Sequence, residues 1–94
     1  MKEKTVEVIV ITYPDEARGE SVLDKLQKFI TDNNGMVNNV DKWGIKYLPY
    51  QIQDLVKGFY FLLEVKADKE LYKRIDISLC LDTEVLRHLL VTKS

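Results

Sequence analysis

The stretch from Trp43 to Val65 reads WGIKYLPYQIQDLVKGFYFLLEV, and its pattern predicts one long β-hairpin. Its first arm alternates between two sides, with Ile45, Tyr47, Pro49 and Gln51 on one and Lys46, Leu48, Tyr50 and Ile52 on the other. A period of two is typical of a strand.

The second arm is more apolar than the first. Phe59, Phe61, Leu63 and Val65 form an apolar row, and Tyr60, Leu62 and Glu64 form a mixed row that borders solvent. Asp54, Lys57 and Gly58 lie in the connection and indicate a turn longer than two residues. Glycine at Gly44 predicts a bulge there, and Pro49 predicts an edge strand because proline donates no ladder hydrogen bond.

Outside the hairpin, the chain predicts a strand over residues 4–12 and a helix that begins after Asp15 and ends at Asn33-Asn34-Gly35. A second helix begins at Ala67-Asp68, where Leu71, Ile75 and Leu79 recur every four residues, and a closing strand covers residues 85–92. Gly19 inside the first helix costs up to about 1 kcal/mol relative to alanine, and the sequence offers no reason for it.

The resulting order β-α-β-β-α-β predicts an α+β, ferredoxin-like sandwich formed by residues 1–94 as a single domain. Four antiparallel strands form one sheet, with the first and third strands central and both helices on the same face. The other face is left for water or a partner.

Composition narrows the class of protein. Among 94 residues, no apolar run approaches the roughly 18 that a membrane-spanning helix needs, and the start MKEKT is typical of neither a secretory signal nor a transit peptide. We therefore expect a cytoplasmic protein that does not associate with a membrane. Cys80 is alone and is expected in the core near a helix end, and no Cys or His cluster predicts a metal or cofactor.

The hairpin also resembles a known family, the bacterial small-subunit ribosomal proteins numbered six. The family hairpin reads Trp or Leu, Gly, any residue, two basic residues, Leu, Ala or Ser, Tyr, any residue, Ile. This chain has Trp43, Gly44, Lys46, Leu48, Tyr50 and Ile52 in those places, followed at the family spacing by Gly58 and Tyr60. Tyr47 replaces the second basic residue and Pro49 the small one, while Pro14 and the run Arg87-His88-Leu89-Leu90-Val91 also resemble the family.

The resemblance implies a structural constituent of the small ribosomal subunit that acts in assembly and translation, with neither catalysis nor a small-molecule substrate. It implies binding to small-subunit ribosomal RNA together with the basic small-subunit protein numbered eighteen, hereafter the partner protein. The candidate RNA-binding residues are Lys2, Lys4, Lys46, Tyr47, Arg87, His88 and Lys93. Lys46 and Arg87 are the strongest of these, Arg87 because its planar fork suits phosphate.

Three other interpretations remain open at this stage. The run from Lys57 to Leu62 resembles an RNA-recognition motif in which Phe59 and Phe61 would stack on bases, although their shared row with Leu63 and Val65 favours a core role. His88 has no nucleophile motif nearby, which disfavours catalysis. The net charge of −1 suits a regulatory or ligand-binding module that dimerises through its sheet better than a strong RNA binder.

Overall fold

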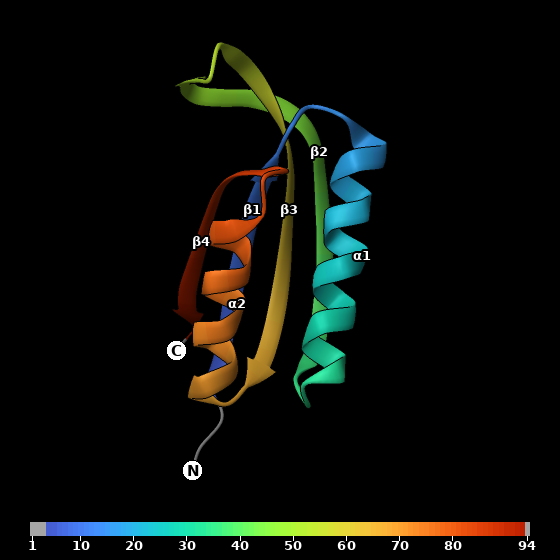
Figure 1. Cartoon of the computed structure of the whole chain (residues 1–94), viewed down its shortest axis with the longest axis vertical. Helices are drawn as coiled ribbons and strands as arrows, with labels where there is room; N and C mark the ends of the chain where they lie inside the picture. The colour runs from blue at the N-terminus through green and yellow to red at the C-terminus, as the bar shows by residue number, and fades with distance from the viewer. Residues whose placement is uncertain (1–3, 94) are drawn as a thin grey trace.

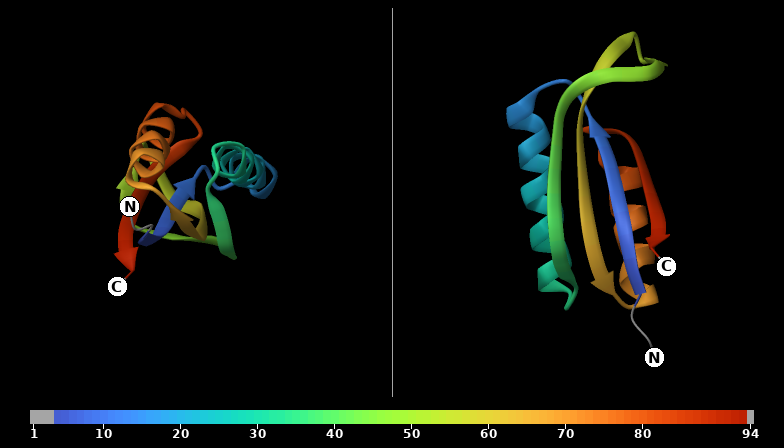
Figure 2. Two further views of the ribbon diagram at one scale, coloured as in Figure 1. Left: turned by 90° about the horizontal axis from the view of Figure 1, so that it is seen from below. Right: turned by 180° about the vertical axis from the view of Figure 1, so that it is seen from behind.

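A computed structural model of the protein describes residues 4–93 as one four-stranded antiparallel sheet with two helices. The elements are β1 (Lys4–Thr12), α1 (Glu16–Asp32), β2 (Met36–Ile52), β3 (Leu55–Ala67), α2 (Lys69–Leu81) and β4 (Val85–Lys93). The strand order is β2-β3-β1-β4, and both helices cover the same face of the sheet (Figures 1 and 2). The predicted ferredoxin-like fold, with its central and edge strands, is confirmed.

Both helices begin where the sequence predicts. The carboxylate of Asp15 accepts a hydrogen bond from the backbone N–H of Arg18 at 3.1 Å, and that of Asp68 accepts from Leu71 at 2.9 Å. These bonds satisfy backbone donors that have no partner inside the helix. At the other end of α1, Asn34 adopts the left-handed conformation with a φ of 70°.

The core lies between the sheet and the helices. Phe59 and Phe61 are only 1% and 0% exposed there, so they are core residues and cannot serve as an open base-stacking platform. Alternate residues of β1 and β3 supply the sheet side, and one stripe of each helix supplies the other side. The helix residues in the core are Val22, Leu23, Leu26, Ile30, Leu71, Ile75 and Leu79.

Gly19 allows α1 to lie directly on the ring of Phe59. A Cβ atom at Gly19 would stand 2.2 Å from Cδ2 of Phe59, a distance that no real side chain tolerates. The helix-destabilising glycine is therefore explained by the close approach of helix and sheet.

The hairpin turn differs from the prediction. β2 ends at Ile52 and β3 begins at Leu55, so the turn has two residues, Gln53 and Asp54. Both have positive φ, 52° and 64°, as the central residues of a type I′ turn do. The sequence predicts a longer turn because neither residue is a glycine or an asparagine, which such a turn usually requires.

Two other local predictions have opposite outcomes. The bulge at Trp43-Gly44 is confirmed, because the β2–β3 register shifts between Lys42 and Gly44 and Gly44 has a φ of 84°. The core position predicted for Cys80 is wrong, because its side chain is exposed. Cys80 follows the buried Leu79 by one residue, about 100° around the helix, and so leaves the apolar stripe.

Candidate nucleic-acid interface

The face of the sheet that carries no helix changes in chemistry along its length. Strand register gives it four cross-strand rows: Gly44–Tyr60–Ile11–Arg87, Asp41–Leu62–Ile9–Leu89, Asn39–Glu64–Glu7–Val91 and Met36–Lys66–Thr5–Lys93. The first row, with the hairpin residues 43–58 beyond it, is called the hairpin end. The last row, with the start of β1, is called the terminal end. Between them lie an apolar row and an acidic row.

At the hairpin end, a lysine and two aromatic rings form one cluster. The rings of Trp43 and Tyr60 stack with centroids 6.3 Å apart and an interplanar angle of 28°. Lys46 Nζ lies 5.6 Å from the centroid of Trp43, within cation–π range. The bulge positions this cluster, because the extra residue places Trp43 beside Tyr60, the cross-strand partner of Gly44.

Tyr47 belongs to the same hairpin but to its other side. Successive strand residues point to opposite faces, so Tyr47 and its cross-strand partner Lys57 lie opposite Lys46 and Gly58. Lys57 Nζ lies 4.8 Å from the ring centroid of Tyr47, which is 72% exposed. The hairpin thus presents a lysine and an aromatic ring on each of its two sides.

Arg87 is the third cationic group at this end. Its Cζ atom lies 6.0 Å from the ring centroid of Tyr50, and its Nε lies 3.5 Å from the Tyr50 hydroxyl. The hairpin extends past the ends of the helices and bends toward the β4 side of the sheet (Figure 1), which brings Tyr50 to Arg87. Three of the predicted residues, Lys46, Tyr47 and Arg87, therefore lie at the hairpin end, with Tyr47 on the opposite side of the hairpin from Lys46.

The remaining candidates lie elsewhere. Lys93 is at the terminal end, six residues and about 20 Å along β4 from Arg87. Lys4 begins β1 at that same end, opposite Ala67, and Lys2 lies outside the described residues. The hydrogen bond from Lys93 to the carboxylate of Glu64, at 2.7 Å, raises the pKa of Lys93 and occupies it.

His88 faces the helices, on the opposite side of the sheet from Arg87. Its Nε2 atom lies 2.7 Å from a carboxylate oxygen of Asp76 on α2, and its side chain is 19% exposed. The candidates therefore do not form one surface, because Lys46, Arg87 and Lys93 lie on the open face whereas His88 faces the helices.

Sequence reasoning missed the aromatic part of the site, namely Trp43, Tyr50 and Tyr60. The signal was available for two of them. A bulge at Trp43-Gly44 opposite a mixed row that contains Tyr60 places both rings on the open face. The contact between Tyr50 and Arg87 joins residues 37 positions apart and carries no local signal.

No arrangement typical of a catalytic or metal site was found in residues 4–93. No group of three or more His, Cys, Asp or Glu side chains in this range is placed to hold a metal ion. Neither of the described helices is long and apolar enough to cross a membrane.

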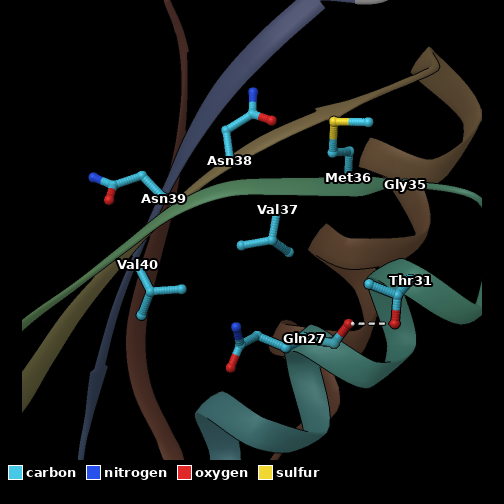
Figure 3. Close-up of a pocket in the computed structure, with 8 residues that line it drawn as sticks. All are labelled: Gln27, Thr31, Gly35, Met36, Val37, Asn38, Asn39 and Val40. Carbon is cyan, nitrogen blue, oxygen red and sulfur yellow. Dashed lines mark hydrogen bonds between the residues drawn. The ribbon is translucent and has the colours of Figure 1, made fainter.

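A cavity of about 560 Å³ between α1 and β2 is lined by neutral side chains, among them Gln27, Thr31, Asn38 and Asn39 (Figure 3).

Comparison with known proteins gives consistent matches. The family model described as "Ribosomal protein S6" matches residues 6–92. The small ribosomal subunit protein bS6 of Clostridium perfringens is 33% identical over 87 residues, which cover 90% of this chain and 92% of that protein. The corresponding protein of Clostridium botulinum is also 33% identical, over 93% of this chain and 95% of that protein.

The fold agrees with a solved structure. The crystal structure of 30S ribosomal protein S6 from Thermotoga maritima matches with a TM-score of 0.89 and 20% sequence identity, and covers 98% of this chain and 89% of that one. The expectation of a non-enzymatic small-subunit protein of cytoplasmic ribosomes is confirmed by the family model and the relatives together. The chain belongs to the ribosomal protein S6 family.

Proposed function

We propose that this chain binds small-subunit ribosomal RNA through its hairpin end and does so together with the partner protein. The observation that carries the proposal is that Lys46, Lys57 and Arg87 each lie against an exposed aromatic ring at that end. Lysine and arginine neutralise backbone phosphates, and aromatic faces stack on unpaired bases. The contacts hold the RNA in position without reading its sequence.

The middle of the open face supports docking of the partner protein. Ile9, Leu62 and Leu89 form an apolar row there, and Leu89 is 57% exposed. In the next row Glu7 lies directly opposite Glu64, whose carboxylate is already paired with Lys93 at 2.7 Å. A basic partner would cover the apolar row and place a cation beside the carboxylate of Glu7.

The near-neutral charge makes the partner necessary rather than incidental. With 14 basic and 15 acidic residues, the chain has little long-range attraction for RNA of its own. Titration of small-subunit RNA with the chain alone should give weak binding, and addition of the partner protein should tighten it strongly. Equal affinities under both conditions would remove the cooperative account.

Two substitutions test the hairpin. Lys46→Ala should weaken RNA binding by the partner-bound complex and flatten the dependence of log affinity on log salt by about one unit. Tyr47→Ala should cost roughly 1–3 kcal/mol of binding with little change in that slope, because stacking does not release counterions. Lys28→Ala, at an exposed position of α1, is the control and should change neither quantity. An unchanged isotherm for Lys46→Ala would exclude the hairpin end as the RNA contact.

A further inference from the structure

The side of the molecule away from the open face has a second candidate site, a groove between α2 and β4. It has a volume of about 460 Å³ and is lined by two lysines, Lys69 and Lys73, together with Tyr72, Asp76 and the β4 residues His88, Leu89 and Leu90. Within residues 4–93, neither lysine has a carboxylate at ion-pair distance. Both ammonium groups are thus available to a ligand.

The acidic groups around the groove are occupied or turned to other partners. Asp76 lies against His88, with 2.7 Å between its Oδ1 and Nε2 of the ring. Asp68 caps α2 by accepting a hydrogen bond from Leu71. Glu70 is exposed in the first turn and does not line the groove. The groove therefore has two lysines without a carboxylate partner and one carboxylate, that of Asp76, which is held by His88.

Helix stability does not explain the two lysines. Lys69 is the first residue of α2, where the positive end of the helix dipole disfavours a cation. Lys73 follows four residues later on the same side of the helix, where two like charges repel. The first turn of α2 also has Glu70, the charge that helix stability favours there, but Glu70 does not line the groove. Two locally unfavourable cations beside one groove are accounted for by an anion that binds both.

We propose that this groove binds backbone phosphate of ribosomal RNA, as a second contact in addition to the hairpin end. The site rests on the proposed RNA-binding function and extends it to residues outside the candidate set. Lys66, exposed at the end of β3, continues the positive charge from Lys69 onto the terminal end of the open face. RNA that reaches both ends of the sheet would be held at two points along the 43 Å length of the protein.

The test is a double substitution, Lys69→Ala with Lys73→Ala, in the full chain bound to the partner protein. Titration with small-subunit RNA at several salt concentrations should show a salt slope flatter by about 1.4–1.8 units, or about 0.7–0.9 for each phosphate that is no longer neutralised. Lys28→Ala with Arg74→Ala is a charge-matched control, because both residues are exposed and neither lines the groove. It retains both groove lysines and Lys66 and should leave the slope unchanged.

The outcomes separate the two proposals. If the double variant keeps the wild-type slope while Lys46→Ala flattens it, the groove is not an RNA contact but the hairpin end still is. If neither variant changes RNA binding, both the groove and the hairpin end are excluded as RNA contacts. If the groove variant weakens binding of the partner protein in the absence of RNA, the groove binds protein and the phosphate proposal is overturned. Thermal melting of each variant confirms folding, which replacement of exposed helix lysines by alanine should leave intact.

Discussion

At the scale of single residues, the contact between Gly19 and Phe59 sets the distance between α1 and the sheet. Gly19→Ala would gain about 1 kcal/mol in helix propensity but would force a Cβ into a fully buried ring, which costs about 1–3 kcal/mol. We expect a net loss of stability of up to about 2 kcal/mol in urea unfolding. Ser21→Ala, exposed on the same helix, should change stability by no more than about 0.5 kcal/mol. A stabilised Gly19→Ala variant would contradict the close packing.

At the turn residues Gln53 and Asp54, in contrast to position 19, we expect glycine to stabilise the protein. An L-residue in the left-handed conformation costs roughly 1–2 kcal/mol, less for Asp than for most. Asp54→Gly should therefore stabilise the protein by up to about 1 kcal/mol, and Asp54→Ala should destabilise it. Thermal melting of the pair is decisive, since equal shifts in the same direction would mean that Asp54 is not held at positive φ.

Residue-scale signals explain which of these features the sequence predicts. The caps Asp15 and Asp68 act within three residues, so their pattern is sufficient. The reason for Gly19 lies at Phe59, forty residues away, and no local pattern contains it. The turn at Gln53-Asp54 has strained residues where the usual signal is Asn-Gly, so the sequence pattern extends the turn further along the chain.

At the scale of elements, two ion pairs tie α1 to the connection between α2 and β4. Lys25 Nζ lies 2.9 Å from Asp82, and Arg18 Nε lies 2.7 Å from Glu84. Partial burial alone would raise the pKa of Asp82, but hydrogen bonds from Lys25 and from the backbone of Glu84 outweigh it and leave this pKa lowered. The pKa of Glu84 is lowered by its hydrogen bond with Arg18.

A lowered carboxylate pKa has a defined sign for stability. The contribution of Asp82 is present above its ordinary value of 3.8 and is lost as the pH falls through the lower folded value. Asp82→Asn keeps an oxygen for the hydrogen bond with the Glu84 N–H but removes the charge. Urea midpoints near neutral pH and at a pH below 3.8 should therefore differ less in this variant than in the wild type. An identical pH dependence would show that the Lys25–Asp82 pair contributes nothing.

At the scale of the whole molecule, the order of the strands predicts which backbone amides are best protected from hydrogen exchange. β1 and β3 are central in the sheet and carry most of the sheet side of the core. Their amides should be the slowest to exchange, and those of β2 beyond the helices the fastest. We also infer that residues 1–94 unfold as one domain, with a single transition by calorimetry and by circular dichroism. Fast exchange in β1 and β3 would contradict this account.

The candidate site is only partly predictable from the sequence because it depends on this larger arrangement. Lys46 and Arg87 belong to segments that resemble one family, yet only the bend of the hairpin toward β4 brings Tyr50 to Arg87. Lys93 and His88 belong to the same strand as Arg87, but one lies about 20 Å away and the other faces the helices. Alternation along a strand predicts that neighbouring side chains point to opposite faces of the sheet. Which residues each of those side chains contacts can be known only from the tertiary structure.

The irregular edge formed by β2 has a further consequence for free copies of the protein. A regular seventeen-residue edge strand would present a continuous ladder of free amides and carbonyls, a template on which another chain could aggregate. Register shifts after Val37 and Lys42 break that ladder into short pieces, and Pro49 removes a donor near its end. The charges of Asp41, Lys42 and Lys46 add to the protection. The bulge that places Trp43 beside Tyr60 thus also disfavours edge-to-edge pairing between copies of the chain.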